Sequence, residues 1–175
     1  MTEFLSEENL TLHNEYLRAL LLRYSILQKS ISGIIGKNVS EIFRMRLPYA
    51  ERKDVFALLP EIELHELYFA SFCASKNLRS AILCERFGSE AAFLNLLYRL
   101  GMQLEYGFIA VNMSGGRIEC ITAKDYVDAY RFGVPMLAID VCEHAYFYDY
   151  GFDKSAYLIS ALPYLDLSKI DNFFS

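Results

Sequence analysis

The sequence lacks the residues and patterns that several classes of protein require. It has no Trp and only three His among 175 residues, so each His can be weighed individually. No apolar run approaches the roughly 20 residues of a membrane-spanning helix, which argues against a membrane protein. The N-terminal stretch MTEFLSEENL has neither the basic nor the apolar region of a secretory signal, so a soluble cytoplasmic protein is expected.

Clustered positive charge and paired cysteines are missing as well. The net charge is −5, and no Lys/Arg cluster is long enough to follow a phosphate backbone, which argues against nucleic acid as the main ligand. A small anionic substrate stays compatible, because a local positive funnel can exist on an acidic protein. No CxxC pair or zinc-finger spacing occurs, so four reduced core thiols are expected: Cys73, Cys84, Cys120 and Cys142.

Hydrophobic residues make up 54% of the chain and aromatic residues 15%, which is ample for one sizeable core. Helical periodicity dominates the first hundred residues. Ser6 followed by two Glu predicts an N-cap, and the apolar spacing predicts a helix from there to about Ser30, where Gly33 and Gly36 break it. Further helices are expected over residues 40–46, 60–74, 78–87 and 89–101.

The pattern changes after residue 101. Residues 106–112 and 117–122 predict two strands joined by the turn 114–116, and the apolar stretch 135–139 predicts a central strand. Short helices are expected over residues 143–150, 154–161 and 167–174. Helices followed by a small antiparallel sheet that helices wrap indicate an α+β fold.

One motif has the spacing of a metal site. Asp140 and His144 lie four residues apart at a strand-to-helix junction, so both side chains can point to one ion, although this spacing often arises by chance. His65 lies on an apolar helix face, and His13 lies on another. Taken alone, either His is more often a structural core residue than a ligand.

These residues stand in an order that resembles the iron/manganese superoxide dismutase family along almost the whole chain. The segments that carry the resemblance are the helix cap that leads to the first His, Ser6-Glu7-Glu8-Asn9-Leu10-Thr11-Leu12-His13; His65-Glu66-Leu67-Tyr68-Phe69; Arg86-Phe87-Gly88-Ser89; Tyr106-Gly107-Phe108; and Asp140-Val-Cys142-Glu143-His144-Ala145-Tyr146. The last is similar to the family signature D-x-W-E-H-A-Y and is the most specific.

The resemblance implies an N-terminal helical hairpin domain, residues 1–77, and a C-terminal α/β domain, residues 78–175, with a three-stranded antiparallel sheet. Each domain would supply two ligands to one Fe or Mn ion per chain: His13 and His65, then Asp140 and His144. Three imidazoles and one carboxylate form a donor set that suits Fe or Mn, whereas a closed set of thiolates is typical of a structural zinc site. The implied substrate is superoxide, which the ion would convert to oxygen and hydrogen peroxide by alternating between 2+ and 3+.

The sequence departs from the family around these ligands. Four and eight residues after the first ligand the family has a His and a Tyr that form its substrate gateway, and this chain has Leu17 and Leu21 there. Tyr16 or Tyr24 could replace them only if the helix packed with a shifted face. A dismutase-like protein with another metal-dependent task is therefore the alternative function, and a purely structural module is a further one.

Two other positions concern the surroundings of the ion, which tune its potential. Glu61 and Glu119 stand where iron-type and manganese-type members have a Gln that bonds to metal-bound solvent. Either carboxylate would stabilise the more oxidised metal or act as a fifth ligand, or it is simply solvated. Cys142 replaces the family Trp, as a soft ligand or as a buried thiol, and Tyr106 is expected, with Phe108, to rebuild the aromatic wall.

The motif around the last His also predicts assembly. In the family, the Glu before this His crosses a dimer interface and hydrogen-bonds the same His of the partner. Glu143 and His144 have this spacing here, followed by Tyr146, so the resemblance implies a homodimer bridged by Glu143 and Tyr146.

Overall fold

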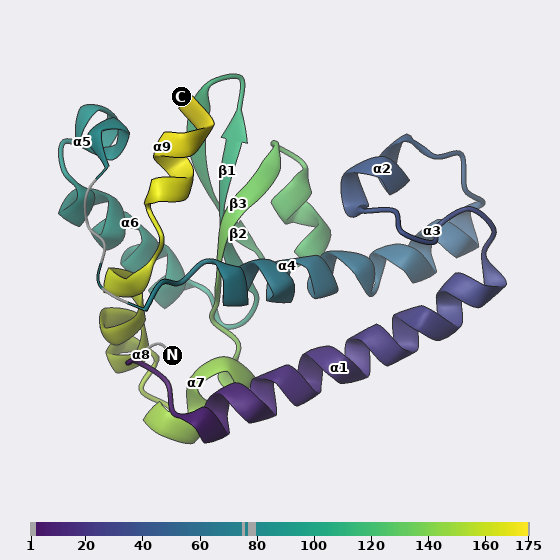
Figure 1. Cartoon of the computed structure of the whole chain (residues 1–175), viewed down its shortest axis with the longest axis horizontal. Coiled ribbons are helices and arrows are strands. Elements are labelled where there is room, and N and C mark those ends of the chain that lie inside the picture. Colours follow the sequence, from purple (N-terminus) through teal and green to yellow (C-terminus); the bar gives the residue numbers. More distant parts are fainter. Residues whose placement is uncertain (1–2, 75, 77–79, 175) are drawn as a thin grey trace.

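The computed structural model describes residues 3–74, 76 and 80–174, and two helices that lie side by side form its N-terminal half (Figure 1). α1 (Glu7–Ser30) is the longer, and α4 (Leu59–Ala70) packs along it. Two short helices, α2 (Val39–Arg44) and α3 (Tyr49–Phe56), connect them at the end of the hairpin that lies away from the sheet. The predicted helical start of the chain is therefore confirmed.

The ends of these helices show which local sequence signals were sufficient to predict where a helix begins or ends. The Ser6 side chain accepts a hydrogen bond from the backbone N–H of Asn9 at 3.1 Å, so α1 starts at the predicted cap. α4 is shorter than the prediction to residue 74. It ends at Ala70 because Ser71 and Cys73 form backbone hydrogen bonds with the distant Asp166 and Tyr164, which draw the chain out of the helix. α3 was missed because it buries one residue, Val55, and so has no apolar periodicity.

The C-terminal part contains the predicted three-stranded antiparallel sheet, which confirms the α+β class. Its order is β2-β1-β3, with β1 (Phe108–Ser114) in the middle, β2 (Arg117–Ala123) on one side and β3 (Val134–Asp140) on the other. The prediction that residues 135–139 form a central strand is wrong. β3 is an edge strand, where a proline is tolerated, and the Ser71 hydroxyl accepts a hydrogen bond from the Ala138 N–H at 2.9 Å.

Both faces of the sheet are covered, which explains why β3 is apolar without alternation. Ile109 and Val111 of β1 pack in the core shared with α6 (Glu90–Gln103) and α8 (Lys154–Ala161). The alternate residues of β1 face α4 and the 3₁₀ helix η1 (Tyr126–Tyr130), which the sequence did not predict. The remaining elements are α5 (Ala81–Phe87), α7 (Glu143–Tyr150), η2 (Leu162–Tyr164) and α9 (Ser168–Phe174).

The expected boundary between residues 77 and 78, and the expected helix start at Leu78, lie outside the described residues. Within the described part of the chain, no helix is both long and apolar enough to cross a membrane. What matters for the site is the meeting of α1, α4, β3 and α7, where the helical hairpin packs against the sheet.

Candidate metal centre

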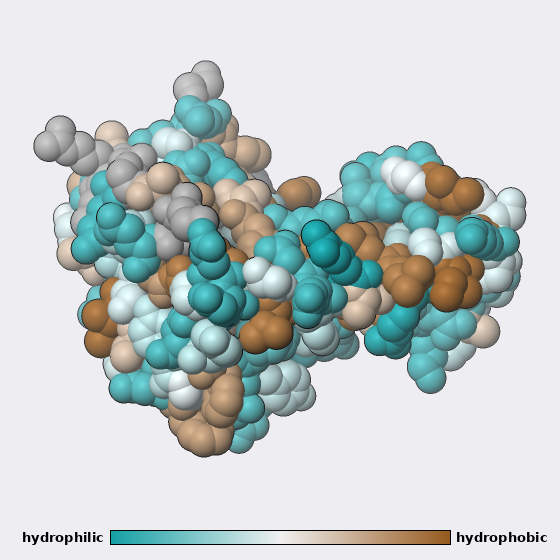
Figure 2. All heavy atoms as spheres, turned by 60° about the horizontal axis from the view of Figure 1, so that its bottom comes forward, coloured by the Kyte–Doolittle hydropathy of each residue, from teal (hydrophilic) through white to brown (hydrophobic). Residues whose placement is uncertain are grey.

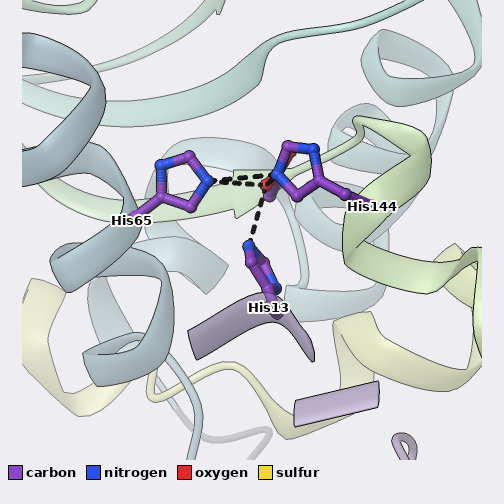
Figure 3. Close-up of side chains that lie close together, drawn as sticks. His13, His65 and His144 are labelled. Carbon is purple, nitrogen blue, oxygen red and sulfur yellow. Dashed lines mark hydrogen bonds and ion pairs between the residues drawn. The ribbon is translucent and has the colours of Figure 1, made fainter. Parts of the chain in front are cut away.

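Four elements bring three imidazoles and one carboxylate to a single point (Figure 3). The Nε2 atoms of His13 from α1, His65 from α4 and His144 from α7 lie 3.2, 3.4 and 2.9 Å from Oδ2 of Asp140, the last residue of β3. All four candidate ligand atoms lie within 4.8 Å of one another. The structure thus brings together the four residues that the sequence singled out as ligands.

The junction between β3 and α7 orients two of these side chains. Cys142 has an extended conformation (φ −71°, ψ 149°) and α7 starts directly after it, so Asp140 ends the strand and His144 lies in the first turn of the helix. The Cys142 N–H donates a hydrogen bond of 2.8 Å to Asp140 Oδ1. This bond holds the carboxylate and leaves its second oxygen, Oδ2, directed at the three imidazoles.

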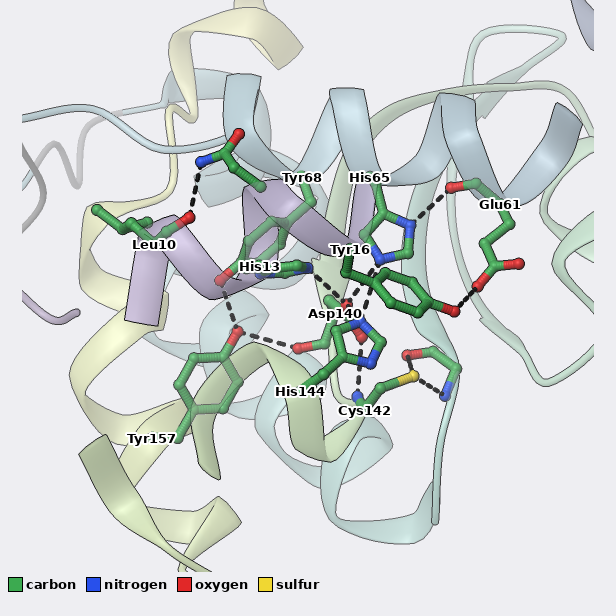
Figure 4. A network of polar contacts seen from close by, with 12 residues as sticks. Leu10, His13, Tyr16, Glu61, His65, Tyr68, Asp140, Cys142, His144 and Tyr157 are labelled. Carbon is green, nitrogen blue, oxygen red and sulfur yellow. Dashed lines mark hydrogen bonds and ion pairs between the residues drawn. The ribbon is translucent and has the colours of Figure 1, made fainter. Parts of the chain in front are cut away.

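Buried polar groups outside the cluster support it in turn. His65 Nδ1 lies 2.7 Å from the Glu61 carbonyl oxygen, so Nδ1 carries the ring proton and Nε2 presents its lone pair to the cluster. The Tyr157 hydroxyl donates to the Asp140 carbonyl oxygen at 2.9 Å and lies 3.2 Å from the Tyr68 hydroxyl (Figure 4). These bonds fix the end of β3 against α4 and α8.

Burial and charge act in opposite directions on the cluster. Burial lowers the pKa of His13 below its ordinary value, although the neighbouring carboxylate opposes this. For Asp140 burial favours the neutral acid, but the close imidazoles of His13, His144 and His65 outweigh it and hold the pKa well below its usual range. Burial also disfavours a charged His65, yet Asp140 and the Glu61 carbonyl raise its pKa. Asp140 is therefore a carboxylate, and His65 binds a proton more readily than His13 does.

The donor set fits a bound cation. Both ring nitrogens of His13 and Oδ2 of Asp140 are buried without a partner in hydrogen-bond geometry among the described residues. His65 Nε2 and His144 Nε2 lie 3.1 Å apart. Atoms that bind one ion at about 2.0–2.1 Å lie roughly 3–4 Å apart, and four of the spacings here are 2.9–3.4 Å. A cation among these atoms would bind the three Nε2 atoms and Oδ2 of Asp140, and an N₃O set suits Fe or Mn.

Tyr16 stands at the mouth of the cluster, together with Glu61 (Figure 4). Its hydroxyl donates a hydrogen bond of 2.6 Å to Glu61 Oε1, and its ring stacks on that of His144, with centroids 4.4 Å apart and 27° between the planes. Tyr16 is 37% exposed, whereas Glu61 is only 7% exposed. Burial first, and then the bond to Glu61, raise the pKa of Tyr16, so the phenol stays protonated.

Of the residues considered for the missing gateway, Tyr16 is the one whose polar and ring contacts reach a residue of the cluster. Leu17 is buried in the hairpin core and Leu21 is 39% exposed, and neither is in contact with the cluster through any polar group. Tyr24 is buried among the same hairpin core residues. Tyr16 reaches the site because it lies three residues after His13, on the same side of the helix.

Two expected neighbours of the site lie elsewhere. Tyr106 was expected in the aromatic wall, but it is 51% exposed and Lys124 lies over its ring at 5.6 Å. Glu119 is half-buried in β2, opposite Asn112 of β1, and is not part of the cluster. Phe108 does form the wall, edge-on to His65 with centroids 5.0 Å apart.

Tyr126 of η1 completes this wall and was missed by the sequence prediction. Its ring packs edge-on against Phe108 at 5.7 Å. Burial raises its pKa, and the nearby carboxylates of Glu61 and Asp140 add to the effect. The sequence around Tyr126 has no local pattern that predicts this 3₁₀ helix. Its position beside the cluster depends on how distant segments pack together.

Cys142 behaves as a buried thiol. It is 7% exposed, burial raises its pKa, and its sulfur accepts a hydrogen bond of 3.1 Å from the Gly107 N–H. Gly107 has φ +112°, and a side chain there would approach the Ala123 carbonyl oxygen to 2.3 Å. Of the two interpretations of Cys142, the structural one agrees with these contacts.

The two residues expected at a dimer interface differ in exposure. Glu143 is exposed beside His144, where a partner can reach it. Tyr146 is 4% exposed and stacks on Tyr157 of its own chain, with centroids 4.9 Å apart and 15° between the planes. The expectation that Tyr146 bridges two chains is therefore corrected, because its side chain is buried in the core of a single chain.

Comparison with known proteins adds the family. Residues 74–172, more than half of the chain, match the C-terminal domain of iron/manganese superoxide dismutases, so the chain belongs to this family. It is 33% identical over 102 residues to a superoxide dismutase [Fe] of Cupriavidus metallidurans. The aligned region covers 54% of this chain and 52% of that protein. The chain thus spans about half the length of the curated relative it matches. The family match includes Asp140 and His144, whereas His13 and His65 precede it.

Proposed function

We propose that this protein binds one Fe or Mn ion and converts superoxide to oxygen and hydrogen peroxide. The proposed ligands are His13, His65, Asp140 and His144. The observation that carries the proposal is that three imidazole Nε2 atoms surround one buried carboxylate oxygen, at distances of 2.9–3.4 Å from it. Membership of the iron/manganese superoxide dismutase family supports it.

Access to the centre is one-sided. His13, His65 and Asp140 are fully buried, while the His144 side chain is 29% exposed and Tyr16 is 37% exposed. A superoxide ion therefore approaches past Tyr16 and His144. When bound, the metal supplies the one-electron couple between its 2+ and 3+ states that dismutation needs. The buried ligands exclude bulk water from the other sides.

Dismutation also needs protons, because two superoxide ions consume two protons to form one peroxide. These protons enter by the same side as superoxide, since the ligands on the other sides are buried. We propose that the Tyr16 hydroxyl donates them. The raised pKa of Tyr16 keeps the donor protonated, and the 2.6 Å bond to Glu61 holds the phenol in place. Its partial exposure lets solvent restore the proton after each transfer. Tyr16 would thus perform the role that Leu17 and Leu21 cannot.

We further propose a homodimer in which Glu143 of each chain bonds to His144 of the partner subunit. His144 is the only proposed ligand with an exposed edge, and Glu143 is exposed beside it. A carboxylate that accepts the second ring N–H of a ligand imidazole fixes its tautomer and raises its basicity. Each chain would therefore strengthen the other's metal site.

Two measurements on the purified protein test the function. Elemental analysis should find about one Fe or Mn per chain, as a single four-ligand site requires, and stopped-flow decay of superoxide should accelerate in proportion to metal content. Bound metal without dismutation would favour the alternative, a dismutase-like protein with another metal-dependent task. Protein that refolds with Fe or Mn yet binds neither would refute both.

A further inference from the structure

The side chain of Asn9, in the first turn of α1, is buried although it is polar. Asn9 is 1% exposed, and neither its amide oxygen nor its amide nitrogen has a hydrogen-bond partner among the described residues. The solvent side of α1 comes forward in Figure 2, where hydrophilic and hydrophobic surface are mixed, and it carries other polar residues of the helix, such as Thr11 and Asn14. Asn9 lies instead on the buried side of the helix, in line with His13 and Leu17.

Folding alone gives no reason for an amide at this position. An amide that leaves water for a buried place without forming hydrogen bonds lowers the stability of the fold. Leu has nearly the same size and shape as Asn and would fill the same space without this penalty. A buried polar group without a partner therefore points to a role in the site beside it.

The proposed ligand His13 lies one helical turn after Asn9, and residues four apart are neighbours on a helix surface. Nε2 of His13 lies 3.2 Å from Asp140 Oδ2 and faces the cluster. Nδ1, its other ring nitrogen, is buried and has no hydrogen-bond partner within the described part of the chain. An imidazole that binds an ion through Nε2 carries its proton on Nδ1, and this N–H needs an acceptor.

The other two imidazoles of the cluster differ from His13 in this respect. His65 Nδ1 lies 2.7 Å from the Glu61 carbonyl oxygen, so its N–H has an acceptor. The His144 side chain is 29% exposed, so solvent or a partner subunit can reach its second ring nitrogen. His13 is fully buried, so an acceptor for its Nδ1–H has to be a buried polar group close by.

We propose that Asn9 is a positioning residue whose amide oxygen accepts a hydrogen bond from Nδ1–H of His13. The Cβ atoms of residues four apart on a helix lie about 5–6 Å from each other, so rotation of the Asn9 side chain is enough to join the two groups. The bond fixes the tautomer of His13, with the lone pair of Nε2 directed at the ion, and raises the basicity of that nitrogen. This inference rests on the proposed function, since it takes His13 as a metal ligand.

Two variants of nearly equal size separate the acceptor from the packing. Asn9→Leu removes the acceptor, whereas Asn9→Asp keeps an oxygen in its place. In equilibrium dialysis with Mn²⁺, Asn9→Leu should bind about 10–100-fold more weakly than the wild type, the usual effect of losing a bond to a ligand His. Asn9→Asp should bind at least as tightly as the wild type, because a carboxylate is a stronger acceptor than an amide. Asn14→Leu, a matched control at an exposed Asn of the same helix, should bind like the wild type.

The stability of the metal-free protein gives a second expectation of opposite sign. Asn9→Leu replaces a buried, unpaired amide with an apolar group, so its midpoint of urea unfolding without metal should equal or exceed that of the wild type. A residue that only stabilises the fold would instead lower this midpoint when it is replaced. Weaker metal binding by a variant that is no less stable is therefore the signature of a positioning residue.

Equal Mn²⁺ affinities of Asn9→Leu and the wild type would overturn the inference. So would an Asn9→Asp variant that binds as weakly as Asn9→Leu, or a metal-free Asn9→Leu that is unfolded or clearly less stable than the wild type. All of these outcomes leave the proposed dismutation standing, because the wild type still binds the ion. A wild type that binds neither Mn²⁺ nor Fe²⁺ would refute the proposed function as well.

Discussion

Removing the hydroxyl of Tyr16 tests the proposed proton supply most directly. In Tyr16→Phe the ring remains, so its stacking on His144 at 4.4 Å is kept, while the 2.6 Å bond to Glu61 is lost. General acid help of this kind is worth about 10²–10⁴-fold. Dismutation by Tyr16→Phe should therefore fall at least about a hundredfold, with unchanged metal content because no ligand is altered.

The cost in stability should be much smaller than the effect on rate. A hydrogen bond to a charged group contributes about 1.5–3 kcal/mol when buried. Tyr16 is 37% exposed, so water replaces part of this bond, and we expect a loss of about 1 kcal/mol in the free energy of unfolding. Thermal or urea unfolding of the variant measures this value and keeps it apart from the catalytic effect.

The assay is stopped-flow superoxide decay at equal metal content. Tyr24→Phe is the matched control, because Tyr24 lies on the same helix and is buried among the hairpin core residues. Small acids added to the buffer should partly rescue Tyr16→Phe, which a purely structural role would not allow. An undiminished rate for Tyr16→Phe, or an equal loss for Tyr24→Phe, would refute the assignment of Tyr16.

The remaining predictions concern the centre, its supports and the dimer. Asp140→Ala should lose the metal and lower the melting temperature, because metal binding contributes folding free energy; metal retained at the wild-type level would contradict the ligand assignment. Acidification should release metal as the pH falls below about 6.5, by about tenfold in affinity per pH unit. The sign follows because protons compete for the imidazoles, and His65, whose pKa is raised, takes up a proton at a higher pH than His13, whose pKa is lowered; equilibrium dialysis at stepped pH measures it. Gly107→Ala should lose about 3 kcal/mol or more of stability, since a Cβ meets the Ala123 carbonyl oxygen at 2.3 Å, whereas Gly36→Ala, with open space around it, should lose only about 1–2 kcal/mol. Glu143→Ala should abolish the α7 dimer contact and weaken metal binding, and light scattering that finds the mutant assembled like the wild type with full metal would rule the bridge out.

Much of the fold could be predicted from local sequence signals. The cap at Ser6, the turn at Ser114-Gly115-Gly116 and the switch from helical to alternating periodicity were sufficient for α1, the hairpin and the α+β class. α7 and α8 occupy the predicted residues, because each is bounded by its own breaks. These features depend on interactions between residues that are close in the sequence, so local patterns were enough to predict them.

The candidate ligands could be selected from the sequence for a different reason. The three His of the chain and Asp140 stand in the order of the ligands of the iron/manganese superoxide dismutase family, so the resemblance implied all four together, although each His alone was more often a structural core residue. The prediction failed where the answer depended on packing between distant segments. The end of α4 is set by backbone bonds to Asp166 and Tyr164, and β3 lies at the edge because of how the strands pair.

The surroundings of the centre were decided only by the tertiary structure. Whether Tyr16, Leu17 or Leu21 reaches the cluster depends on the rotation of α1 against α4 and α7, which no residue of α1 encodes alone. Tyr106 and Tyr146 had the right sequence positions, yet one is exposed and the other is buried in the core. The sequence by itself determined α1, α7, α8, the β1–β2 hairpin and which four side chains are candidate ligands. The packing of α1, α4, β3 and α7 decided which residues surround these ligands. Such residues come from segments that are far apart in the sequence, as Tyr16 and His144 are.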